Sequence, residues 1–150
     1  MTLRVPPIVQ LLICAVLAWG LAKLLPKFTL SSALFAFLGY GALLMGVIVL
    51  ALALMAFARS RTTVNPLSPE KAETLVTTGL YRFTRNPMYL AMAFILTGGA
   101  LLLGNIASLA SPAVFIVVMT IFQIKPEERA LQSIFGDAFT AYRRQTRRWL

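Results

Sequence analysis

Long apolar stretches separated by short polar segments dominate this chain. Four stretches stand out, and they cover residues 8–25, 33–58, 88–103 and 106–124. A helix that crosses the hydrocarbon core of a bilayer needs about 20 residues, within a range of about 17–25. The second and fourth stretches meet this length clearly, whereas the first and third are marginal and are expected to tilt or to be sheltered by neighbouring helices. We therefore predict four membrane-spanning helices.

The pattern changes after residue 124. Pro126 suits the first position of a helix, and Glu127 and Glu128 favour the positive end of a helix dipole. Apolar residues then recur at spacings of three and four, as on one face of a helix; they are Leu131, Ile134, Phe135, Ala138, Phe139 and Tyr142. We predict one amphipathic C-terminal helix that lies along the membrane surface or caps the bundle.

Composition supports lipid as the main solvent of this chain. Hydrophobic residues make up 59% of the sequence and charged residues 13%, whereas a soluble domain has about 45–50% and about 25%. The predicted fold class is an all-α polytopic membrane bundle. We expect a single membrane domain over residues 1–150. Its parts are the first two spans (1–58), a cytoplasmic loop (59–87), a helical hairpin (88–124) and the C-terminal helix (125–150).

The distribution of charge predicts the orientation of the chain. Lysine and arginine number 14 against five acidic residues. Four spans place 12 of these cations on the side that holds both termini and leave Lys23 and Lys27 on the other side. Because cytoplasmic loops carry an excess of lysine and arginine, we expect both termini in the cytoplasm. Because the arginines lie at the ends of apolar runs, they indicate anionic lipid headgroups and not nucleic acid as the partner. A chain of this size is expected in a prokaryotic inner membrane, with its site facing the cytoplasm.

Two residue types are nearly absent, and their absence limits the chemistry. The chain has no histidine and one cysteine, Cys14, which lies inside an apolar stretch. Histidine is the usual proton shuttle and the commonest metal ligand. Zinc hydrolysis, histidine-based triads and other metal sites are therefore not expected.

Two polar clusters remain once the spans are placed. The first lies in "GLYRFTRNPMYLA", where Tyr81, Arg85, Asn86 and Tyr89 come within nine residues of one another, and the second is the pair Glu127 and Glu128. The short uncharged segment "GNIAS" predicts a tight hairpin that returns both clusters to the same end of the bundle. Taken singly, such residues are ordinary membrane anchors and helix caps. Together they indicate a site.

Proline and glycine positions refine the expected helices. Pro87 marks the start of the third span, since proline is tolerated in a first helical turn, and Asn86 is then a plausible N-cap. Small residues allow close approach of helices in a membrane. Glycines in the second and third spans and in the turn that follows are therefore candidates for close packing; they are Gly39, Gly46, Gly98, Gly99 and Gly104.

The two polar clusters also carry a family resemblance. "LVTTGLYRFTRNPMYLA", followed by "EERALQSIFGDAFTAYRR", resembles the integral-membrane methyltransferases of the isoprenylcysteine carboxyl methyltransferase and phospholipid methyltransferase group. The group's pattern is G-x-Y-x-x-x-R-H-P-x-Y, then a pair of Glu, then F-G-x-x-Y/F-x-x-Y. It is matched by Gly79, Tyr81, Arg85, Pro87 and Tyr89, and then by Glu127, Glu128, Phe135, Gly136, Phe139 and Tyr142. Asn86 replaces the group's histidine and cannot titrate near neutral pH.

The resemblance implies S-adenosylmethionine as methyl donor, in a cytoplasm-facing pocket roofed by the C-terminal helix. The implied cofactor-binding residues are Tyr81, Arg85, Asn86, Pro87, Tyr89, Glu127 and Glu128. Either glutamate suits the cofactor's ammonium or ribose hydroxyls, and Arg85 suits its carboxylate. A ring face of Tyr81 or Tyr89 suits its cationic part, and Asn86 suits the adenine edge. Glu128 is the candidate catalytic base for an acceptor that must lose a proton.

The methyl acceptor stays open at this point. Prenylated cysteine carboxylates, phospholipid amines and other membrane-dissolved molecules all fit a lipophilic partner, and the oligomeric state is undetermined. Two other classes of function compete with methyl transfer. One is a membrane reductase that binds NADPH and is related to steroid reductases. The other is a non-enzymatic membrane protein, either a scaffold or a methyltransferase relative that has lost activity.

Overall fold

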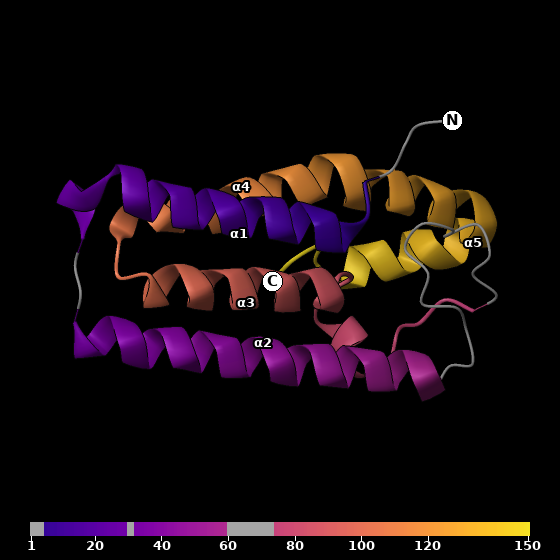
Figure 1. Cartoon of the computed structure of the whole chain (residues 1–150). Helices are drawn as coiled ribbons and strands as arrows, with labels where there is room; N and C mark the ends of the chain where they lie inside the picture. Colours follow the sequence, from indigo (N-terminus) through magenta and orange to yellow (C-terminus); the bar gives the residue numbers. More distant parts are fainter. Residues whose placement is uncertain (1–4, 30–31, 60–73) are drawn as a thin grey trace.

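The structure is a computed structural model that describes residues 5–29, 32–59 and 74–150, and it is a bundle of helices (Figure 1). No β-strand is present among these residues; they contain two isolated bridges, one between Thr29 and Asn105 and one between Thr84 and Arg147. The predicted all-α class is confirmed. Most of the polar loop predicted between the second and third spans, residues 60–73, lies outside the described residues.

The helices begin and end close to the predicted positions. The long helices are α1 (Pro7–Leu24), α2 (Ala33–Arg59), α3 (Pro87–Leu102), α4 (Ala110–Met119) and α5 (Lys125–Gln145). Short 3₁₀ turns precede them or lie between them, namely η1 (Pro26–Phe28), η3 (Gly79–Arg82) and η4 (Ile106–Leu109). A π-helical turn, η5 (Thr120–Ile124), joins α4 to α5 without a break. Within the described ranges, three helical stretches are long and apolar enough to cross a membrane, namely Pro7–Leu24, Ala33–Arg59 and Ile106–Gln145.

Helices α2 and α3 run side by side (Figure 1), and glycines allow their backbones to touch. A Cβ atom on Gly98 would lie 2.8 Å from the Gly39 carbonyl oxygen and 2.9 Å from the Leu43 amide nitrogen. Gly46 is similarly closed in by α3 backbone. The predicted close packing is therefore found at three of the glycines. It is wrong for Gly99, because a Cβ there would meet nothing within 4 Å.

The turn after α3 brings α4 back against α1. Gly104 has a φ of 62°, a conformation that suits glycine, so this residue serves the turn. Two side chains that follow then bind the carbonyl groups of α1 and its end. Asn105 Nδ2 donates to Leu25 O at 2.9 Å, and Ser108 Oγ donates to Ala18 O at 2.9 Å. Because polar groups in an apolar layer need internal partners, these bonds fix how α4 lies along α1.

The C-terminal helix differs from the prediction. Gly136 has φ 49° and ψ −120°, which breaks α5 into two segments, and the second segment folds back toward the bundle (Figure 1). The expectation of one continuous amphipathic helix is wrong, because a conformation open mainly to glycine interrupts it. Phe139 and Tyr142 are buried as expected, but Ile134 and Ala138 of the same predicted apolar face are exposed.

Candidate functional site

The two polar clusters predicted from the sequence meet at the end of the bundle where α3 and α5 begin. Arg85, just before α3, contacts Glu128 of α5, with Nη2 at 2.9 Å and Nε at 3.2 Å from the Oε1 atom. Tyr89, in the first turn of α3, donates from its hydroxyl to Glu127 Oε1 at 2.6 Å. The α3–α4 hairpin thus brings together residues about forty positions apart, as the sequence pattern predicted.

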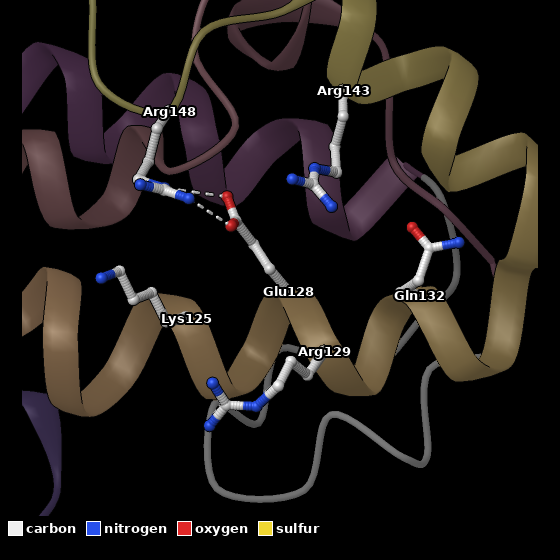
Figure 2. Close-up of a pocket in the computed structure, with 6 residues that line it drawn as sticks. All are labelled: Lys125, Glu128, Arg129, Gln132, Arg143 and Arg148. Atoms are coloured by element: carbon white, nitrogen blue, oxygen red, sulfur yellow. Dashed lines mark hydrogen bonds and ion pairs between the residues drawn. The ribbon is translucent and has the colours of Figure 1, made fainter.

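Glu128 lies between two arginines. Arg148, from the C-terminal segment, places Nη2 2.7 Å from Glu128 Oε2 and Nε 3.1 Å from Oε1, and Figure 2 shows these two bonds. Together with Arg85, four charge-assisted hydrogen bonds converge on one carboxylate that is 7% exposed. Arg148 was not among the predicted site residues, because a basic C-terminal run indicates attraction to lipid headgroups.

The two arginines also set the charge of Glu128. This residue lies beyond the apolar stretch that ends at Ile124. Burial alone would raise its pKa, but the hydrogen bonds and charges of Arg148 and Arg85 outweigh burial and hold the pKa of Glu128 below its ordinary value. A carboxylate held ionised in this way is a weaker proton acceptor. The role of Glu128 as a base stays a prediction that its surroundings do not favour.

The C-terminal segment after α5 lies across the start of α3. The Arg85 amide nitrogen donates to Arg147 O at 2.9 Å, and Asn86 Nδ2 donates to Arg148 O at 2.9 Å. Asn86 does occupy the N-cap position of α3, but its side chain makes no capping bond to the helix, so that part of the prediction is wrong. Its amide ties down the C-terminal segment instead.

The other predicted site residues are packed into the protein. Tyr81 is 6% exposed, its ring lies 5.3 Å from that of Phe57 between centroids, and its carbonyl oxygen accepts from the Tyr142 hydroxyl at 2.7 Å. Burial raises the pKa of Tyr81 above its ordinary value, so its hydroxyl stays protonated at neutral pH. Pro87 is buried at the first turn of α3, and Tyr89 is 6% exposed. Their roles toward a cofactor remain predictions.

A hollow of about 320 Å³ lies beside the Glu128 carboxylate, between the two segments of α5 and the C-terminal segment (Figure 2). Its lining residues are Lys125, Glu128, Arg129, Gln132, Arg143 and Arg148. Glu128 is the predicted site residue among them. The sequence pattern did not single out Gln132, which lies one turn after Glu128 on the first segment of α5, or Arg143, which reaches the hollow because the chain reverses at Gly136. We call this hollow the cationic cavity.

Comparison with known proteins gives two informative matches. The sequence model of the phospholipid methyltransferase family matches residues 34–138. Protein-S-isoprenylcysteine O-methyltransferase from Schizosaccharomyces pombe is 36% identical over 78 residues, which is 50% of this chain and 32% of the yeast protein. The chain thus spans about a third of that relative's length.

A third relative is matched over its whole length. An uncharacterized protein from Haemophilus influenzae is 43% identical over 63 residues, which is 42% of this chain and all of that protein. No solved structure matches the chain. The family match covers more than half of the chain and includes α3 and both glutamates. The chain therefore belongs to the phospholipid methyltransferase family.

Proposed function

We propose that this chain is an integral-membrane methyltransferase that takes its methyl group from S-adenosylmethionine and transfers it to a lipophilic acceptor. The observation that carries the proposal is the meeting of the family-matched segment around Arg85 with Glu127 and Glu128 beside the cationic cavity. The apolar helices support an integral-membrane location, and the family match supports methyl transfer. Neither the family match nor the yeast relative favours a reductase or a non-enzymatic protein.

The proposal includes α3 as a fourth span. With 16 residues α3 is about 24 Å long, which is shorter than a hydrocarbon core of about 30 Å. Half of its residues are buried in the bundle, so neighbouring helices shelter it from lipid. Four spans place both termini and the cationic cavity on one side, and the positive-inside rule makes that side the cytoplasm. A bacterial inner membrane is the setting that we propose.

The residues around the cavity fit S-adenosylmethionine chemically. The cofactor has a carboxylate, an ammonium, a sulfonium and an adenosine. The Arg143 guanidinium points into the cavity and suits the carboxylate (Figure 2). The Glu128 Oε1 atom already accepts three hydrogen bonds, but Oε2 accepts one, so Oε2 is the atom that suits the ammonium. At about 320 Å³ the cavity lies at the lower end of the range of about 300–1,000 Å³ for small-molecule sites.

The chain's contribution to the chemistry is alignment. S-adenosylmethionine supplies an activated methyl group and leaves as a neutral thioether, so no acid is needed. Arg143 and Glu128 would fix the two charged groups of the cofactor, and the Arg85–Glu128–Arg148 cluster holds Glu128 in one orientation. An acceptor that is already anionic needs no base either, which agrees with the lowered pKa of Glu128.

Transfer of a labelled methyl group tests this function. Membranes with the protein are incubated with S-adenosylmethionine carrying a deuterated methyl group, and lipophilic extracts are analysed by mass spectrometry. We expect at least one extracted molecule to gain the labelled methyl group, and we expect the gain to be lost with Arg143→Gln and kept with Arg144→Gln, whose side chain is exposed. Equal labelling in membranes with and without the protein would overturn the proposal.

A further inference from the structure

A second hollow lies on the other side of α5 from the Glu128 carboxylate. It has a volume of about 920 Å³ and runs between α1 and α4 toward the start of α5. Apolar side chains line it along α1, α4 and η5; they are Ile13, Cys14, Leu17, Val114, Val118 and Phe122. Polar side chains gather at its α5 end, where Gln10, Arg129 and Ser133 border it. We call this hollow the amphipathic groove.

The side chain of Gln10, which borders this groove, has one acceptor atom that receives no hydrogen bond from the described residues. It is 6% exposed, and its Nε2 donates to Val5 O at 2.9 Å. Its Oε1 atom is buried and has no donor among the described residues. A buried acceptor without a donor is costly, so most such atoms in proteins are satisfied. The groove therefore suits an occupant that brings an N–H or O–H group to Gln10.

Arg129 borders both the amphipathic groove and the cationic cavity. Its side chain is exposed and forms no ion pair within the described part of the chain. Figure 2 shows it on the other side of α5 from the Glu128 carboxylate. A guanidinium at the polar end of an apolar groove favours an anionic group on the occupant.

We propose that the amphipathic groove binds the methyl acceptor, and that this acceptor is an amphiphile with three features. It has an apolar chain, a hydrogen-bond donor that meets Gln10, and an anionic group that is held by Arg129, the residue that borders both hollows. Gln10 and Leu17 are seven residues apart on α1, so the apolar chain can lie along about 10 Å of this helix. This inference rests on the proposed function and narrows its acceptor from any lipophilic molecule to an anionic one.

Photolabelling with a designed amphiphile tests the proposal on the full chain in lipid nanodiscs. The probe is N-dodecanoylglycine with a diazirine in its alkyl chain, which supplies an apolar chain, an N–H group and a carboxylate. We expect labelled peptides from α1 and α4, at the positions that line the groove. Two competitors separate the polar contacts, because N-dodecanoylsarcosine lacks the N–H group and N-dodecanoylethanolamine lacks the negative charge.

Variants assign each contact to its residue. Arg129→Gln should raise the concentration of N-dodecanoylglycine needed for half-maximal competition about 10-fold, which corresponds to the loss of one charged hydrogen bond. The concentration of N-dodecanoylethanolamine needed for half-maximal competition should not change. Gln10→Leu should remove an advantage of about 5-fold that the glycine compound holds over the sarcosine compound. Arg144→Gln, an exposed arginine that borders neither hollow, is the matched charge control and should change nothing.

The outcomes separate this proposal from the proposed function. Labels spread over the lipid-facing side of α2, a label that joins two copies of the chain, or a charge preference kept by Arg129→Gln would overturn the groove assignment. Binding of S-adenosylmethionine is measured on the same samples by calorimetry. Its absence alongside groove labelling would remove the proposed function, whereas its presence without groove labelling would remove only the acceptor assignment.

Discussion

Replacing Glu128 by glutamine is expected to release the C-terminal segment 146–150 from the start of α3. The substitution keeps the size of the side chain and removes its charge. It leaves the guanidinium of Arg85, whose side chain is 11% exposed, without the carboxylate that neutralises it. The same change removes the ion pair that ties Arg148 to α5. The segment then depends on its backbone contacts, on the side chains of Thr84 and Asn86, and on Trp149, whose Nε1 donates to Thr120 Oγ1 at 3.0 Å.

The size of the effect follows from burial. Removing one partner of a buried ion pair costs about 3–5 kcal/mol. Arg85 keeps a backbone acceptor, because its Nη1 donates to Arg143 O at 3.3 Å as well as to Thr146 O. The Arg148 side chain is 32% exposed and can turn to water, so its share is smaller. We expect a loss at the low end, about 3 kcal/mol, which is roughly a 100-fold increase in local opening.

Hydrogen exchange at one backbone amide reports this opening directly. The Arg85 amide nitrogen donates to Arg147 O, so its exchange requires the C-terminal segment to leave. We expect exchange of this amide to accelerate about 100-fold in Glu128→Gln, while the amides of α3 beyond residue 90 keep their protection. Asp137→Asn removes the same charge from an exposed position of α5 and serves as the control.

Two results would refute the reasoning. Unchanged exchange of the Arg85 amide in Glu128→Gln would mean that the ion-pair cluster does not hold the C-terminal segment. Equal acceleration in Asp137→Asn would mean that overall charge, and not the contact with the two arginines, governs docking.

Three further predictions follow from single contacts. The pKa of Glu128 is held below its ordinary value of 4.5, so its contribution to holding the C-terminal segment should be constant from neutral pH down to about that value and be lost at lower pH. Cleavage of the C-terminal residues by a carboxypeptidase that is active in acid would measure this, and it should become faster only below that pH. Gly98→Ala should lower the free energy of unfolding in detergent by about 1–3 kcal/mol, because the added Cβ meets α2 backbone; Gly99→Ala, with open space around it, should leave it unchanged or raise it by about 0.5–1 kcal/mol. Gly136→Ala should destabilise the fold-back by about 1–3 kcal/mol, since φ 49° and ψ −120° strain an L residue, and amide exchange over residues 137–145 would measure it. A loss for Gly99→Ala as large as that for Gly98→Ala would contradict the packing argument.

Hydropathy located the helices well because length and apolarity are local properties of a sequence. The predicted first stretch starts one residue after Pro7, and Pro87 begins α3 as predicted; proline fixes the first turn at both positions. The contact between Arg85 and Glu128 also followed from the sequence, because two helices joined by a short uncharged turn run antiparallel and return their outer ends to the same side. Helix spacing and charge order were enough for this part of the site.

The rest of the site depends on one backbone conformation that periodicity does not report. An isolated glycine inside a helical pattern is tolerated at a cost of about 1 kcal/mol, so Gly136 gave no reason to expect a reversal of the chain. Arg143 and Arg148 reach the cavity only because α5 reverses there, and their positions in a basic run indicated lipid headgroups. Asn86 followed the N-cap pattern, but a carbonyl group of the C-terminal segment competes for its side chain.

Binding of S-adenosylmethionine to the purified protein tests the central claim most directly. Isothermal titration calorimetry is expected to show one site with a Kd between about 1 μM and 1 mM, weakened at least about 10-fold by Arg143→Gln and unchanged by Arg144→Gln or by added NADPH. Absence of binding at millimolar cofactor, or equal weakening by the two neighbouring arginine substitutions, would contradict a cofactor site in the cationic cavity.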